Sequence, residues 1–201
     1  MTTPILIGAN LVVSLLAFSA FRSRQNPERF LFTPARVARG ENISGMILSQ
    51  FSHADLGHLI FNMLALYFFA PVVEHFLGAG GLLTTYALSG VAATLLTFVV
   101  HKNDTGYRAL GASGSISGVI FASIVLYPGM NLYVFFVPIP IPGPLFAVGY
   151  IAYSVLMARR QFGNIGHEAH IGGAIAGFLI AGMLSETGFT PLLRSFRDLF
   201  S

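Results

Sequence analysis

Six apolar runs separated by polar segments are the main pattern in this 201-residue chain. An α-helix rises about 1.5 Å per residue, so about 20 apolar residues cross a hydrocarbon layer of roughly 30 Å. The runs cover residues 4–21, 59–77, 82–100, 113–127, 145–158 and 170–184. The pattern therefore predicts an all-α polytopic membrane protein, with six transmembrane helices bundled in one domain over residues 1–201.

Polar residues and glycines mark some of the helix ends. Ser52 and Asp55 have the spacing of a capping box, and Asp55 is also an N-cap candidate, so the second helix should begin near here. Glycines at positions 78, 80 and 81 are expected to end it. The fourth run has about 15 residues, or roughly 22 Å as a helix, which would leave Ser113 below its own membrane surface.

The segments between and beside the runs differ in kind. Residues 22–52 are too long for a tight helix connection, and we expect a partly membrane-embedded first loop. Prolines within 138–144 exclude a regular helix and indicate a connector at the membrane interface. The tail 186–201 is expected to hold a short amphipathic helix. Because no cationic stretch precedes the first run, it is expected to be a retained span rather than a signal peptide.

Composition supports the membrane class and excludes several functions. Hydrophobic residues make up 54% of the chain and charged residues only 9%, whereas soluble domains have about 25% charged residues. The chain has no cysteine, which excludes disulfides, thiolate metal sites and cysteine nucleophiles. The excess of 11 Lys and Arg over 8 acidic residues is too small to indicate nucleic-acid binding.

Polar side chains gather near one rim of the predicted bundle. A polar group without a partner in hydrocarbon costs several kcal/mol, so each one needs a role. Because alternate spans begin on the same side of the membrane, the second, fourth and sixth runs bring these residues to one face. They are His53, His58, Asn62, Ser113, Ser115, Ser117 and His170. Two more histidines, His75 and His101, lie at loop edges, where we expect them to be solvated.

This set contains the parts of a serine hydrolase. A serine hydroxyl becomes a useful nucleophile when a base such as imidazole takes its proton, which suits Ser113 and His170. The Ser113 N–H at a helix N-terminus, with the side chains of His58 and Asn62, could stabilise the oxyanion. Because Glu168 is expected to point elsewhere on its helix, a Ser–His dyad fits better than a triad.

The same residues also fit purely structural roles. A lone intramembrane serine more often hydrogen-bonds a neighbouring helix than acts in catalysis. The small residues at 114 and 118, and at 173 and 177, are four apart, which predicts close helix packing. The stretch 167–170 has histidines at i and i+3, whereas a zinc protease helix requires i and i+4. A metal cluster of His53, His58 and His170 stays open as an alternative.

Three motifs together resemble the rhomboid family of intramembrane serine proteases. They are His53-x4-His58-x3-Asn62, Gly111-Ala112-Ser113-Gly114 and Ala169-His170-Ile171-Gly172-Gly173. The resemblance covers roughly residues 40–185. It implies that Ser113 is the nucleophile and His170 the general base. It also implies that His58, Asn62 and the Ser113 N–H form the oxyanion hole, and that His53 supports the nearby loop.

The resemblance also implies a reaction and a setting. The family cleaves single-span transmembrane proteins near the membrane surface and uses no metal or cofactor. The fifth span would be the mobile gate for substrate, and the lipid bilayer the surrounding medium. Many members carry a tyrosine four residues after the nucleophile, stacked on the base, and this chain has Ser117 there.

The positions of the Lys and Arg residues indicate an orientation in the membrane. Nine of the 11 Lys and Arg residues lie on the predicted catalytic side, which by the positive-inside rule places the site in the cytoplasm. The resemblance instead implies an outward-opening site in a bacterial inner membrane.

The alternative function is a rhomboid-like protein that binds or sorts transmembrane helices without cleaving them, but binding alone requires neither Ser113 nor His170. No feature indicates an oligomeric state.

Overall fold

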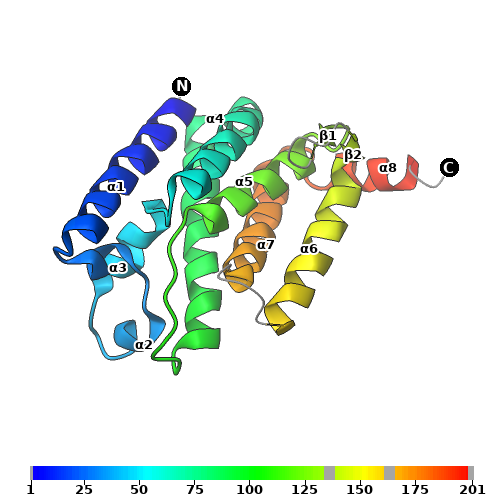
Figure 1. The fold of residues 1–201 in the computed structure, drawn as a ribbon. Helices are drawn as coiled ribbons and strands as arrows, with labels where there is room; N and C mark the ends of the chain where they lie inside the picture. Colours follow the sequence, from blue (N-terminus) through cyan, green and yellow to red (C-terminus); the bar gives the residue numbers. More distant parts are fainter. Residues whose placement is uncertain (1, 134–138, 161–165, 199–201) are drawn as a thin grey trace.

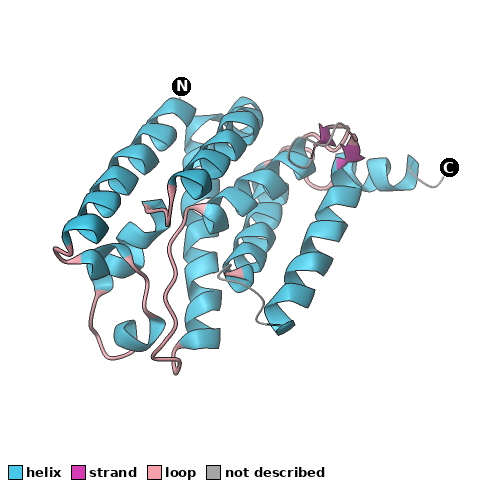
Figure 2. Cartoon of the chain, viewed as in Figure 1, coloured by secondary structure: helices cyan, strands magenta, loops and turns pink. Residues whose placement is uncertain are grey.

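The structure, a computed structural model, describes residues 2–133, 139–160 and 166–198, and within them it is mostly helical (Figures 1 and 2). The α-helices are α1 (Thr3–Ser23), α2 (Pro34–Val37), α3 (Ile43–Leu48), α4 (Leu56–His101), α5 (Ser113–Leu126), α6 (Gly143–Arg160), α7 (His167–Leu184) and α8 (Thr190–Asp198). Two 3-10 turns, η1 (Pro27–Phe30) and η2 (Ser49–Phe51), lie in the first loop. All six apolar runs are helical, as the pattern predicted.

The second and third runs form two helical segments that meet at a kink and share the label α4. Together they are 46 residues long, and the helical geometry is interrupted at Gly78, where φ is 69° and ψ is 179°. A left-handed φ strains residues with a side chain, so glycine suits this position. The predicted break is therefore correct, but helical geometry resumes at once instead of giving way to a loop.

The starts of two helices refine the sequence predictions. Asp55 is the N-cap of α4, and its Oδ1 accepts a hydrogen bond of 2.8 Å from the His58 N–H. The choice between Ser52 and Asp55 is thereby resolved in favour of Asp55. Helix α7 begins at His167, three residues before the expected start, so His170 lies in its first turn.

Helix α5 is the centre of the molecule, with α4 and α7 packed on it. From Gly114 to Leu126 its residues are buried, except for the partly buried Ile120. Helix α1 packs along α4 at one edge, and α6 stands beside α7 at the other edge (Figure 1). The start of α5, which carries Ser113, is therefore enclosed by several helices.

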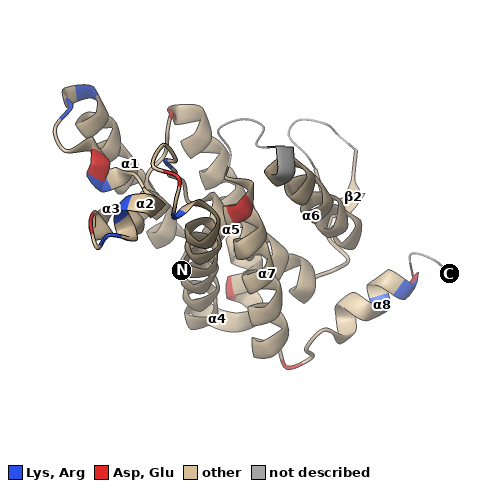
Figure 3. Cartoon of the chain, turned by 90° about the horizontal axis from the view of Figure 1, so that it is seen from below, with Lys and Arg blue, Asp and Glu red and all other residues tan. Residues whose placement is uncertain are grey.

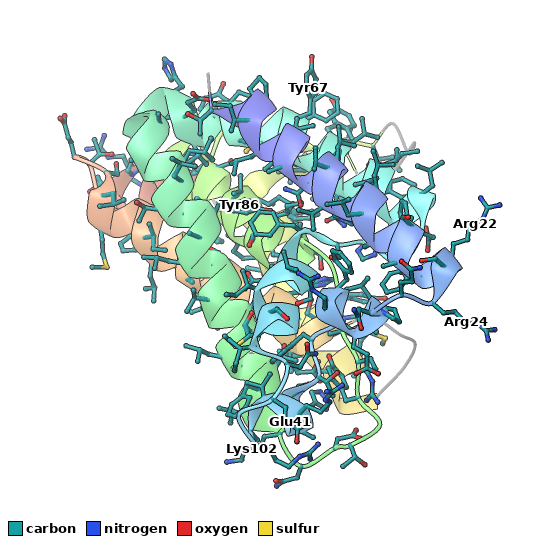
Figure 4. All side chains as sticks on the ribbon, turned by 90° about the vertical axis from the view of Figure 1, so that its left-hand side faces the viewer. Arg22, Arg24, Glu41, Tyr67, Tyr86 and Lys102 are labelled. Carbon is teal, nitrogen blue, oxygen red and sulfur yellow. The ribbon has the colours of Figure 1, made fainter. Side chains whose placement is uncertain are left out.

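Buried polar contacts fasten α1 to α4. Tyr86 points from α4 towards α1 (Figure 4), where its hydroxyl lies 3.0 Å from Asn10 Nδ2. At the other end, Glu74 accepts a hydrogen bond of 2.6 Å from the Thr2 N–H and one of 3.0 Å from the Thr3 hydroxyl. These bonds fix α1 although much of its surface is apolar and exposed.

Length and polarity suit a membrane. Helices α1 and α4 are each long and apolar enough to cross one, while α5 and residues 143–158 of α6 are shorter apolar helices. Lys and Arg residues gather over α1 to α3 and on α8, and the helices between them carry few charges (Figure 3).

The connector and the tail agree with the sequence predictions as far as they are described. Residues 131–132 (β1) pair antiparallel with 141–142 (β2), and no helix forms in the described parts of 130–142. The rest of the connector, 134–138, lies outside the described residues, as does most of the loop from 161 to 168. The tail contains α8, whose Leu192 is buried against the core.

Candidate active site

The side chains of Ser113 and His170 meet, although 57 positions separate them in the sequence. His170 Nε2 lies 2.8 Å from Ser113 Oγ. Ser113 is the first residue of α5, and His170 lies in the first turn of α7. An imidazole nitrogen at this distance can accept the hydroxyl proton.

Glycines bring the two helices close enough for this contact. A Cβ added to Gly173 would collide with the backbone of Gly114, and one added to Gly177 would collide with the backbone of Gly118. Gly172 faces α4, where an added Cβ would lie 2.8 Å from the Ala92 carbonyl oxygen. The prediction that these spaced small residues pack helices is confirmed.

The first loop holds the turn that precedes Ser113. Phe32 and Ala109 exchange two backbone hydrogen bonds, of 2.8 and 3.0 Å. The Gly111 N–H donates to the Ser49 carbonyl oxygen at 2.8 Å, and Gly111 has a φ of +138°. The chain enters α5 directly after this turn. The first N–H groups of α5, that of Ser113 included, have no acceptor within the helix.

His58 lies beside the nucleophile. A Cβ placed on Gly111 would be 3.1 Å from His58 Nε2 and 3.6 Å from Ser113 Oγ, so both side chains flank this glycine. The Asn62 amide donates a hydrogen bond of 3.0 Å to the His58 carbonyl oxygen one turn earlier. The structure thus brings His58 to Ser113, while Asn62 lies deeper and supports the turn that carries His58.

His53 connects this region to α1. Its side chain is fully buried, its ring packs edge-to-face on His58 at 4.9 Å, and its Nδ1 lies 2.8 Å from Ser14 Oγ. Ser14 also donates to the Phe51 carbonyl oxygen at 3.0 Å. His53 is therefore a packing support behind His58.

A cavity of about 690 Å³ opens beside Ser113. It is lined by the first loop, by the loop that precedes α5 and by α4. Its polar lining includes Gln50, Thr94, Thr97 and Tyr107. Burial, with the nearby Glu168 and Asp104 carboxylates, raises the pKa of Tyr107 to about 12, so its hydroxyl keeps its proton. A cavity of this size and polarity can admit water to the nucleophile.

Tyr150 of α6 is a site residue that the sequence analysis missed. Its ring stacks on the His170 ring, with centroids 6.2 Å apart and an interplanar angle of 29°. Its hydroxyl is 2.7 Å from Ser117 Oγ, which also lies within 2.8 Å of the Ser113 carbonyl oxygen. A tyrosine inside an apolar run was the available signal, but its partners lie on other helices.

One histidine expectation is wrong. His101 is not solvated, because its ring stacks on Tyr107 at 3.7 Å and its Nε2 lies 3.5 Å from Glu168 Oε1. Burial of the loop against the end of α4 creates this pocket. Glu168 is thus directed to His101 and away from His170, whereas His75 is exposed as expected.

Metal-ligating side chains are dispersed in the described parts of the chain. No group of three or more His, Cys, Asp or Glu residues is placed there to hold a metal ion. The alternative cluster of His53, His58 and His170 is therefore not assembled, since the His170 nitrogen facing the site contacts Ser113.

Comparison with known proteins gives consistent matches. A family model described as the rhomboid domain matches residues 40–187. RHOMBOID-like protein 12, mitochondrial, of Arabidopsis thaliana is 30% identical over a 144-residue alignment, and the match covers 64% of this chain and 43% of that protein. Presenilin-associated rhomboid-like protein A, mitochondrial, of Danio rerio is 32% identical over a 162-residue alignment that covers 77% of this chain and 42% of that protein. Rhomboid protease GluP of Bacillus subtilis is 32% identical over a 136-residue alignment that covers 66% of this chain and 24% of that protein.

The chain spans less than half the length of each of these three relatives. Two of them are named as mitochondrial, so the comparisons do not support the expectation of a bacterial inner membrane. The matched region covers most of the chain and includes both helices that meet at Ser113 and His170. The chain therefore belongs to the rhomboid family of membrane-integral proteins.

Proposed function

We propose that this protein is an intramembrane serine endopeptidase that uses Ser113 and His170 as a catalytic dyad. The observation that carries the proposal is the 2.8 Å distance between His170 Nε2 and Ser113 Oγ. Oγ attacks the scissile carbonyl carbon while Nε2 takes the hydroxyl proton. The same imidazolium then gives this proton to the leaving amine, and a water molecule hydrolyses the acyl-enzyme by the reverse roles.

The oxyanion of the tetrahedral intermediate needs donors on the side of Ser113 that faces the cavity. The Ser113 N–H at the start of α5 and the His58 imidazole are the proposed donors, with the Asn62 amide as a third. The proposal is supported by the shared position of His58 and Ser113 beside Gly111. His53 keeps His58 in place through its edge-to-face contact.

The proposed substrate is a single-span transmembrane protein. In this proposal the six apolar helical segments all cross the bilayer, and the first loop is embedded in it. Because α5 is short and Ser113 is its first residue, the site would lie below the membrane surface. The polar cavity beside Ser113 supports water delivery to a bond cleaved at that depth.

Reconstitution in liposomes with a single-span substrate that contains a glycine-rich, helix-weak segment tests the proposal. Wild type should cleave it, while Ser113→Ala and His170→Ala should leave it intact at unchanged thermal stability. Binding without cleavage by wild type and both variants, across a panel of such substrates, would instead support a rhomboid-like protein that binds or sorts transmembrane helices.

A further inference from the structure

Tyr150 makes polar and aromatic contacts with both helices of the proposed dyad. Its ring stacks on His170 of α7, and its hydroxyl is 2.7 Å from Ser117 of α5. Phe121 and Phe146 pack on the same ring, at centroid distances of 5.5 and 5.7 Å. The tyrosine ring is therefore held in one orientation against the imidazole.

The imidazole obtains its orientation from rings rather than from a carboxylate on its own turn. Glu168, two residues before His170, is directed to His101 at 3.5 Å. His170 instead packs edge-to-face on His167, with centroids 6.1 Å apart and an interplanar angle of 80°, and stacks on Tyr150. Of these two rings, only that of Tyr150 comes from another helix.

Helix α6 is attached to the bundle mainly along one side. It lies at the edge of the molecule beside α7 (Figure 1), and Leu145 and Val148 on its outer side are more than half exposed. Within the described residues, the bond from Tyr150 to Ser117 is the side-chain hydrogen bond that joins α6 to its neighbours. A movement of α6 away from α5 would break this bond and withdraw the ring from His170.

We propose that Tyr150 is a positioning residue that couples the place of α6 to the orientation of His170. With α6 packed, the ring holds the imidazole towards Ser113. With α6 displaced, the base loses this support and Ser113 is less readily activated. The proteolytic step would then proceed only after α6 has returned around a bound substrate. This inference rests on the proposed function, because it concerns the same dyad.

Three variants separate the ring from its hydrogen bond. Tyr150→Phe keeps the ring and removes the bond, Ser117→Ala removes the same bond from its other end, and Tyr150→Leu removes the ring. Val148→Ala is the control, since Val148 is on the same helix but 56% exposed. We expect kcat to fall about three- to tenfold in the first two variants, the equivalent of one hydrogen bond. The double variant should fall no further, because both changes remove one shared bond.

The readout that distinguishes positioning from gating is labelling of Ser113 by a small, soluble fluorophosphonate. This reagent phosphonylates an activated serine with release of fluoride, and it does not require a transmembrane substrate to pass α6. In Tyr150→Leu we expect the labelling rate and kcat to fall together, by roughly tenfold or more, with KM little changed. Val148→Ala should match wild type in both assays.

Unchanged labelling in Tyr150→Leu, with only proteolysis altered, would overturn the inference and leave α6 as a simple barrier. If Tyr150→Leu is too unstable to purify, Tyr150→Phe and Ser117→Ala decide the matter, and wild-type labelling rates in both would overturn it equally. A wild type that neither cleaves nor becomes labelled would instead count against the proposed function itself.

Discussion

The backbone of Gly114 in α5 lies directly against Gly173 in α7, with no room for a side chain between them. A methyl group on Gly173 would lie 2.7 Å from the Gly114 carbonyl carbon and closer still to its oxygen. Gly114 directly follows Ser113, and Gly173 lies about one turn after His170. The separation of the two helices therefore sets the distance between nucleophile and base.

Gly173→Ala should consequently damage both stability and activity. Overpacking of this kind costs about 1–3 kcal/mol, and it would push His170 away from Ser113. We expect a lower melting temperature in detergent and at least a tenfold loss of proteolysis. Gly149→Ala in α6 is the control, because an added Cβ there meets nothing within 4 Å. Equal activity of the two variants would contradict this role of Gly173.

Removal of an oxyanion donor should lower kcat with little change in KM. We expect His58→Ala and Asn62→Ala each to lose roughly 10²–10³-fold, the usual cost of one such donor. Because His58 flanks Gly111 together with Ser113, its loss should be the larger. His75→Ala, at an exposed position, should keep the wild-type rate in the same liposome assay. Near-normal rates in both site variants would remove them from the oxyanion hole.

Ser14→Ala should destabilise the first loop from a distance. The Ser14 hydroxyl is the partner of the fully buried His53 Nδ1 and of the Phe51 carbonyl oxygen. A buried polar group left without its partner costs about 1–3 kcal/mol. Thermal unfolding should reveal this loss, whereas Ser19→Ala at an exposed position of α1 should have little effect. A melting temperature equal to wild type in Ser14→Ala would show that the bond is dispensable.

The loop between α2 and α3 should loosen in acid. Hydrogen bonds from Arg39 and Arg36 hold the pKa of the exposed Glu41 carboxyl below its usual range. The bonds are therefore present above the usual carboxyl pKa and are lost as pH falls through the lowered value. Hydrogen exchange of residues 36–41 should rise in that range, and Glu41→Gln should show faster exchange already at neutral pH. Exchange in the variant that equals wild type at neutral pH would contradict the role of Glu41.

The sequence predicted the helices well because they depend on local patterns, and it predicted that Ser113 and His170 lie near each other because alternate spans begin on the same side. Apolar runs, the glycine at 78 and the cap at Asp55 act within a few residues of where they lie. The environment of His101 and the stacking of Tyr150 depend on which helices become neighbours. Neither contact corresponds to a fixed spacing in the sequence. The expectation for His101 was therefore wrong, and the role of Tyr150 was missed.

The exchange of backbone hydrogen bonds between Phe32 and Ala109 bears on where the working unit of the protein begins. The family match starts at residue 40, after Phe32 and well after Ser14. A truncated protein limited to the matched region would keep Ser113 and His170 but would lose the two backbone hydrogen bonds from Phe32 to the turn before Ser113. The contacts that hold the turn before Ser113 therefore extend beyond the segment by which the family is identified.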